Sequence, residues 1–145
     1  MTLTLTAQDL KHVLEQQFAG CRGQTHQRIL VPSRGLRYSW SAGAACDARV
    51  RDVRLLDPEG AVLHRIVDAD GAVPNPGRRY RVTVNDFLAG GGDGFTAFRA
   101  GTDPLVGPRD IDALTTFLGR HLRPARAAYD PAAPSLLKPR VTRLP

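Results

Sequence analysis

Alternation of apolar and polar residues predicts several short strands in this chain. Thr2–Thr6 alternates strictly, and in Leu36–Trp40 the residues Leu36, Tyr38 and Trp40 share one face. A turn at Pro58–Gly60 is expected to join two strands as a hairpin. The other segments with strand character are Arg28–Val31, Val50–Leu55, Ala61–Val67, Tyr80–Val84, Phe95–Phe98 and Arg140–Thr142.

Apolar residues at helical spacing predict one helix near each end of the chain. Thr6 and Asp9 form the pattern of a capping box, and Gly20 is expected to end the helix that follows. A second helix is expected over Asp110–Leu122, and Pro124 would prevent its continuation. Hairpin strands with a helix at each end predict an α+β fold. The apolar positions of the two helices are Leu10, Val13, Leu14 and Phe18, then Ile111, Leu114, Phe117, Leu118 and Leu122.

The stretch Asn85–Phe95 places four glycines around one carboxylate, Asp93, with an aromatic residue on each side. Glycine permits positive φ and close approach of other groups to the backbone. An aromatic ring beside an acceptor-only carboxylate suits a nucleoside, because the ring can stack on the base and the carboxylate can accept hydrogen bonds from both ribose hydroxyls. From the residues alone, a tight turn in which Asp93 caps backbone amides is an equally good interpretation.

The same stretch resembles the signature of the C-terminal, substrate-recognition domain of the 5′-nucleotidase family, which also includes UDP-sugar hydrolases and 2′,3′-cyclic phosphodiesterases. The resemblance rests on Tyr80–Val82, Asn85–Ala89 and Gly91–Phe95, with Gly90 in a variable place. Ser33–Tyr38 also resembles a family segment, with Arg34 inserted. The resemblance extends over most of the chain, and it implies a layered α/β/β/α-type domain.

The resemblance implies a role for individual residues of the loop. Phe87 would stack on the base and Asp93 would bind the ribose hydroxyls, so these two are the expected substrate-binding residues. Asn85, Gly91, Gly92 and Gly94 would give the loop its shape. Phe95 is expected in the core, at the start of the next strand. The function implied is recognition of a nucleoside or nucleotide by a phosphohydrolase of nucleotide catabolism.

The catalytic part of such an enzyme has no counterpart in this sequence. In the family, a metallophosphoesterase domain holds two metal ions, and its ligand motifs do not occur here. We therefore expect no catalytic residue, metal site or cofactor in this chain, and divalent metals only in a separate catalytic domain, in cis or in trans. The four histidines, which form no spaced pair, are His12, His26, His64 and His121.

Residues 1–124 are expected to form the family domain, incomplete at its start, and residues 125–145 a proline-rich extended tail. In the family, an Asn-Gly-Gly-x-Arg-type loop and a second base-stacking aromatic residue lie upstream of the point that matches Thr2. Two functions remain open at this stage. The chain could be the recognition domain of a phosphohydrolase, or a non-enzymatic remnant that acts as a binding or interaction module.

The charge of the chain limits the kinds of partner that we expect. The formal charge of +6 suits an anionic ligand, although a solvated basic surface explains it equally well. The basic residues are spread along the chain without a nucleic-acid motif, so we expect no nucleic-acid partner.

No apolar run reaches the roughly 20 residues of a membrane span. No signal peptide opens the chain, although the family is usually exported. Export would favour a disulfide between Cys21 and Cys46 over two free thiols.

Overall fold

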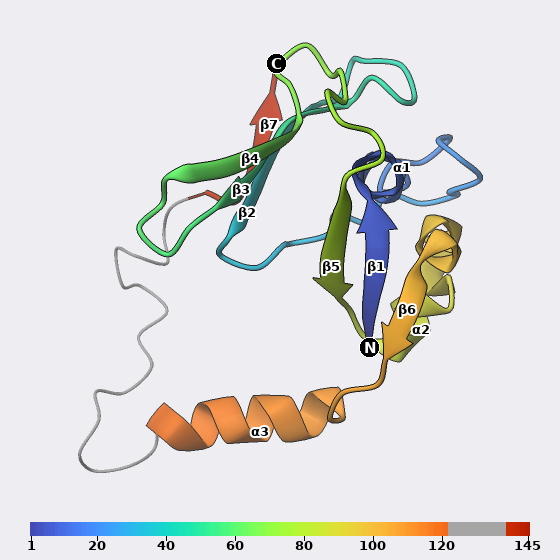
Figure 1. Cartoon of the computed structure of the whole chain (residues 1–145). Coiled ribbons are helices and arrows are strands. Elements are labelled where there is room, and N and C mark those ends of the chain that lie inside the picture. Colours follow the sequence, from blue (N-terminus) through green and yellow to red (C-terminus); the bar gives the residue numbers. More distant parts are fainter. Residues whose placement is uncertain (122–138) are drawn as a thin grey trace.

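Two β-sheets and short helices make up the fold of the described residues (Figure 1). The structure is a computed structural model that describes residues 1–121 and 139–145. An antiparallel sheet has the order β5 (Arg79–Thr83), β1 (Thr2–Thr6), β6 (Thr102–Leu105). A mixed sheet has the order β4 (Val62–Val67), β3 (Val50–Leu56), β2 (Leu36–Ser41), β7 (Val141–Leu144). The predicted α+β class is confirmed, as are the β3–β4 hairpin and the late strand.

The helices are short, and two of them lie in the glycine-rich segment. α1 (Ala7–Glu15) follows β1 directly, and its capping box is confirmed: Asp9 N donates to Thr6 Oγ1 at 3.1 Å. The helix ends at Glu15, before Gly20, and turns continue beyond it, since Phe18 N donates to Glu15 O. The remaining helices are α2 (Asp86–Ala89), the 3-10 helices η1 (Gly92–Gly94) and η2 (Thr96–Ala100), and α3 (Asp110–His121).

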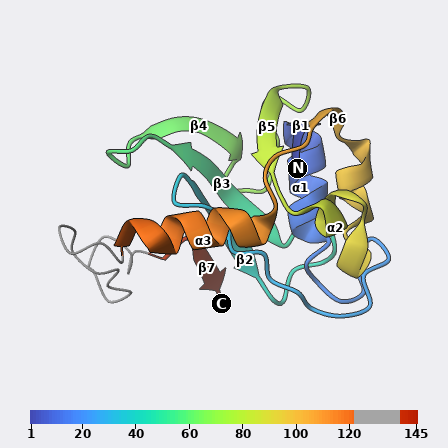
Figure 2. The ribbon, with the colours of Figure 1, turned by 90° about the horizontal axis from the view of Figure 1, so that it is seen from below.

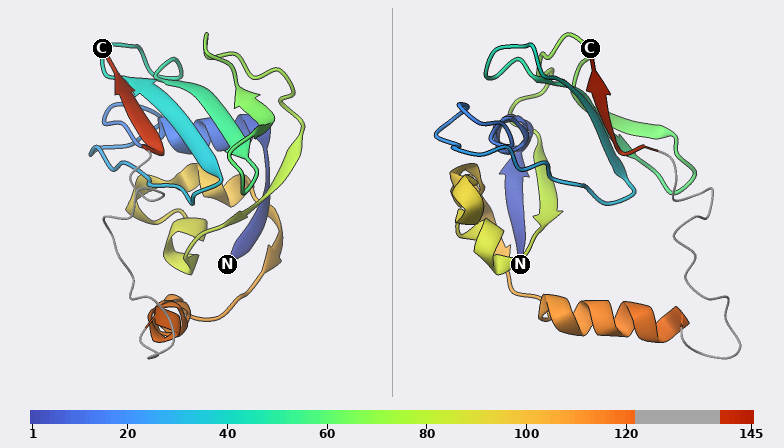
Figure 3. Two further views of the ribbon diagram at one scale, coloured as in Figure 1. Left: turned by 90° about the vertical axis from the view of Figure 1, so that its left-hand side faces the viewer. Right: turned by 180° about the vertical axis from the view of Figure 1, so that it is seen from behind.

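The core lies around α1, which contacts η2, β1, β3 and β4 and so connects the two sheets. In the left view of Figure 3, α1 passes behind the four-stranded sheet, while α2 and η2 lie below it. Apolar side chains from these elements form one buried cluster. Its members include Leu5, Leu10, Val13, Leu14, Phe18, Tyr38, Trp40, Val50, Val53, Ile66, Val67, Phe95 and Phe98.

Two predicted strands are wrong. Residues Arg28–Val31 form no strand, because the backbone N–H groups of Arg28 and Leu30 donate to Gln17, to its carbonyl at 2.8 Å and to its Oε1 at 2.6 Å. Residues Phe95–Phe98 form a 3-10 turn instead, with Phe98 N donating to Phe95 O. The turn brings both aromatic rings into the core with their centroids 6.2 Å apart, whereas residues three apart in a strand face opposite sides.

α3 runs along the lower end of the molecule, away from α1 (Figures 1 and 2). Its predicted apolar face is exposed, with exposed fractions of 56% for Ile111, 52% for Leu114 and 42% for Leu118. Leu122, Pro124 and the tail up to residue 138 lie outside the described residues. None of the described helices has the length and apolar character that crossing a membrane requires.

Candidate functional site

The glycine-rich segment begins with a capped helical turn that presents Phe87 to solvent. β5 leads through Val84 to Asn85, whose side-chain oxygen accepts a hydrogen bond from Leu88 N at 2.8 Å. An asparagine in this position satisfies an N–H group that the first turn of a helix leaves unpaired. Phe87 follows in the first turn, and 58% of its surface is exposed. Asn85 thus fixes the direction of the turn rather than facing a ligand.

Gly92 leaves room for the Phe87 ring because it has no side chain. A Cβ atom on Gly92 would lie 2.5 Å from Cε1 and 2.6 Å from Cδ1 and Cζ of the Phe87 ring. The ring therefore lies directly over the backbone of Gly92, and it remains more than half exposed. An aromatic side chain that is braced on one side and open on the other is a suitable stacking surface for a planar ligand.

Asp93 follows Gly92 and has a left-handed backbone, with φ of 54°. Its backbone carbonyl accepts a hydrogen bond from Gln24 Nε2 at 2.9 Å, whereas its side chain is 43% exposed. The carboxylate oxygen Oδ1 lies 3.4 Å from Nη1 of Arg28, whose side chain is 44% exposed. Asp93 therefore offers a fixed backbone and an accessible carboxylate next to the residue that supports the Phe87 ring.

The neighbouring glycines allow two other side chains to approach the loop. Gly91 and Gly94 have φ of +85° and +82°, a conformation that disfavours residues with a Cβ atom. A Cβ atom would lie 2.6 Å from Arg99 Nε at Gly91 and 2.9 Å from Gln24 Oε1 at Gly94. Arg99 Nε also donates to Gly90 O at 2.9 Å. The loop is thus held by a side chain on each side, and its glycines make room for both.

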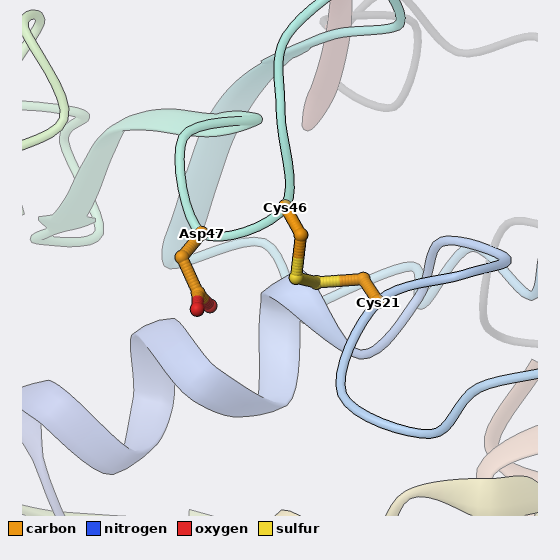
Figure 4. Close-up of side chains that lie close together, drawn as sticks. All are labelled: Cys21, Cys46 and Asp47. Carbon is orange, nitrogen blue, oxygen red and sulfur yellow. A yellow bond between two sulfur atoms is a disulfide. The ribbon is translucent and has the colours of Figure 1, made fainter.

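The disulfide Cys21–Cys46 joins the turn after α1 to the loop before β3 (Figure 4). Asp47 lies beside it, and these three residues form a group with metal-ligand spacing among the described residues. Both sulfurs belong to the disulfide, and the Asp47 carboxylate pairs with Arg22 at 2.5 Å. The group does not fit a dinuclear metal centre, because that requires several carboxylate and imidazole ligands around two ions.

The three histidines with described side chains lie in separate places and have separate partners. His12 hydrogen-bonds to Gln8, His26 to Thr25, and His64 to Arg78. Burial in α1, with a smaller contribution from Arg22, lowers the pKa of His12 below 6.5. The structure brings none of these three into a common metal-ligand group within the described residues.

The sequence matches the family model of the 5′-nucleotidase C-terminal domain over residues 1–100. This match covers more than half of the chain, so the chain belongs to the 5′-nucleotidase C-terminal domain family. The resemblance seen in the Asn85–Phe95 segment is thereby confirmed.

Known proteins that resemble this chain are much longer than it is. The fold is similar to that of a 5′-nucleotidase precursor from Thermus thermophilus, with a TM-score of 0.66, 25% identity, and coverage of 99% of this chain but 24% of that one. A putative 5′-nucleotidase from Staphylococcus aureus has a TM-score of 0.53 and 15% identity, over 98% of this chain and 26% of that one. The Cell wall protein Lmo0130 of Listeria monocytogenes is 30% identical over 95 residues, which are 66% of this chain and 10% of that protein.

Three residues of the site were not found by sequence reasoning: Gln24, Arg28 and Arg99. Gln24 and Asp93 are separated by 69 positions, and no local pattern relates them. Arg28 belongs to a segment with strand character, where its side chain had no assigned direction. The glycines in the loop carried a signal, since Gly91, Gly92 and Gly94 each allow the close approach of another group.

Proposed function

We propose that this chain is the nucleoside-recognition part of a 5′-nucleotidase-type phosphohydrolase. The observation that carries this proposal is the exposed Phe87 ring, fixed over Gly92, next to the exposed carboxylate of Asp93. A nucleoside has the two matching features, a planar base and a sugar with two neighbouring hydroxyls. Membership of the family supports the same conclusion.

Each half of the site would contribute a separate interaction. Stacking of a base on Phe87 would contribute about 1–3 kcal/mol, as at other aromatic surfaces that bind bases. Hydrogen bonds from the 2′- and 3′-hydroxyls to the charged Asp93 would contribute about 1.5–3 kcal/mol each. Neither interaction reads the identity of the base, so a preference among bases would have to come from other groups.

Hydrolysis itself would take place on another part of the protein. The chain spans about a quarter of the Thermus thermophilus structure that it resembles, and no described group of residues fits a dinuclear metal centre. Divalent metals and catalytic groups would therefore belong to a metallophosphoesterase domain, in the same polypeptide or in a partner. In this arrangement the chain supplies substrate affinity for nucleotide breakdown and no chemical step.

The proposal is tested by titrating the purified chain with adenosine and with AMP while recording NMR chemical shifts, which detect millimolar binding. Phe87→Ala removes the ring, and Asp93→Asn removes the charge. Asparagine is preferred to alanine because it tolerates the left-handed backbone of Asp93. Asp103→Asn is the matched control, since Asp103 also has positive φ, 50°, and pairs with an arginine, Arg79, at 3.1 Å.

We expect shifts centred on Phe87 and Asp93 in the unchanged protein, at least tenfold weaker binding in each site variant, and unchanged binding in the control. A well-dispersed spectrum without ligand-induced shifts would reject the proposal for this chain and favour the non-enzymatic module. Equal affinities in all four proteins would show that nucleosides bind elsewhere.

A further inference from the structure

Gln24 is a buried polar residue whose side chain reaches the ligand loop. Only 4% of its surface is exposed. Its Oε1 accepts hydrogen bonds from the backbone N–H groups of Thr25 and His26, at 3.1 and 3.4 Å. Its Nε2 donates to the backbone carbonyl of Asp93 at 2.9 Å. These bonds fix the orientation of the side-chain amide, in which an N–H group donates to Asp93 O.

The backbone of Gln24 is fixed as firmly as its side chain. Gln24 N donates to Cys21 O at 2.9 Å, and Gly20 N donates to Gln24 O at 2.8 Å. Cys21 is fully buried and is bonded to Cys46. The disulfide, the turn between Cys21 and Gln24, and the Gln24 amide thus form a continuous connection from the core to the Asp93 loop.

We propose that Gln24 is a positioning residue that sets the direction of the Asp93 carboxylate, and so determines how strongly the site distinguishes ribose from 2′-deoxyribose. This inference rests on the proposed nucleoside site. Gln24 itself is not placed to contact a ligand, because its side chain is buried and its amide is bonded to the chain.

The backbone of Asp93 requires such support. A residue with a Cβ atom at φ of 54° is less stable than in the right-handed region, so the loop would relax if nothing held it. Rotation about the Asp93 backbone would swing its carboxylate away from the Phe87 ring. The pair with Arg28 is too exposed to prevent this, since exposed ion pairs at 3.4 Å are weak. The Gln24 hydrogen bond is a buried side-chain contact that reaches the Asp93 backbone directly, and it acts together with the bond from Phe95 N to Gly92 O that closes the turn.

Gln24→Glu removes the donated hydrogen bond when the binding is measured at a pH at which the buried glutamate is ionised. A glutamate has the same length and keeps the acceptor for Thr25 and His26, but when ionised it has no hydrogen to donate to Asp93. Gln17→Glu is the matched control. Gln17 is fully buried, donates to Leu14 O at 2.6 Å and accepts from Leu30 N and Tyr38 Oη, but it holds no residue of the loop. The same chemical change is thereby made at two buried glutamines, of which one reaches Asp93.

The measurement is the ratio of the dissociation constants for 2′-deoxyadenosine and adenosine, in each variant and in the unchanged chain. Loss of one hydrogen bond to a charged group corresponds to roughly tenfold or more, so we expect a ratio of about ten or above in the unchanged chain. We expect a ratio below about three in Gln24→Glu and the original ratio in Gln17→Glu, even if Gln17→Glu lowers the melting temperature. Destabilisation alone would weaken both ligands together and leave the ratio unchanged.

A Gln24→Glu ratio equal to that of the unchanged chain overturns the inference while leaving the nucleoside site intact. A ratio near one in the unchanged chain also overturns it, because Asp93 would not then read the 2′-hydroxyl. Absence of adenosine binding to the unchanged chain instead rejects the proposed function. If Gln24→Glu does not fold, Gln24→Met replaces it, since methionine has a similar length and no donor.

Discussion

The ring of Phe87 covers Gly92 so closely that a Cβ atom on Gly92 would lie 2.5 Å from ring atom Cε1. The two residues are five positions apart and belong to different helical turns, α2 and η1. Their contact fixes the stacking surface relative to Asp93, because Asp93 is the next residue along the chain. A substitution at Gly92 can therefore move the Phe87 ring while the Asp93 carboxylate stays in the chain.

Gly92→Ala should displace the Phe87 ring without unfolding the domain. The three atoms nearest to the added Cβ all belong to the ring of Phe87, a side chain that can rotate, and Gly92 does not have positive φ. We expect adenosine affinity to fall nearly as far as in Phe87→Ala, with a change in stability below about 1 kcal/mol.

Gly90→Ala is the control for this variant, since a Cβ atom there would make ordinary contacts of 3.5 and 3.6 Å with backbone oxygens. Calorimetric titration and thermal melts of the two variants check the prediction. Normal adenosine affinity in Gly92→Ala would show that the position of the ring does not matter for binding.

Removal of the disulfide should destabilise the domain and also reach the ligand site. The sulfurs join residues 25 positions apart, and closing a loop of that length contributes about 3 kcal/mol. The double variant Cys21→Ala, Cys46→Ala is expected to melt roughly 10 °C lower. Because Cys21 O accepts a hydrogen bond from Gln24 N, the ratio of 2′-deoxyadenosine to adenosine dissociation constants should fall as well. An unchanged melting temperature would contradict the stabilising role.

The stability of the domain should depend on the protonation of Glu15. Its carboxylate is buried and accepts hydrogen bonds from Val50 N at 2.7 Å and Asp47 N at 3.2 Å. Burial, the largest cause, raises the pKa of Glu15 above 4.5, more than these bonds lower it. The folded state therefore holds the proton more tightly than the unfolded state does. The stabilisation is fully present below pH 4.5 and is lost as the pH rises through the raised folded-state pKa.

Glu15→Gln removes this titration. The melting temperature of the unchanged protein, relative to that of Glu15→Gln, should fall as the pH rises from 4.5 through the raised pKa of Glu15. His12, whose lowered pKa acts in the opposite direction, is present in both proteins and so cancels in the comparison. A constant difference across this range would show that Glu15 keeps an ordinary pKa.

Arg28→Ala should affect anionic ligands more than neutral ones. Its pair with Asp93 is nearly half exposed on both sides, so the loss of stability should stay below about 1 kcal/mol. Removal of a positive charge next to the site should weaken AMP binding a few-fold relative to adenosine, and added salt should erase the difference. The control is Arg65→Ala, which breaks a partly exposed pair with Asp52 on the four-stranded sheet. Equal losses of AMP affinity in the two variants would point to net charge alone.

Local patterns predicted most of the elements, because their causes are local. The capping box of Thr6 and Asp9 and the alternation in Leu36–Trp40 both act over a few residues. The strand predicted at Arg28–Val31 does not form, because Gln17, a residue of another segment, accepts hydrogen bonds from the N–H groups of Arg28 and Leu30. Phe87 and Asp93 could be proposed as site residues from the loop composition, whereas Gln24 could not, since only the folded chain brings it to Asp93.

β7 is joined in parallel to β2, with Tyr38 opposite Val141 and Ser41 opposite Leu144. The part of the chain that matches the family model ends at residue 100, well before this strand. A fragment cut at that boundary would leave one side of β2 without its partner, and unpaired strand edges promote aggregation. The part of the chain that matches the family model is thus shorter than the part that is needed to complete the four-stranded sheet.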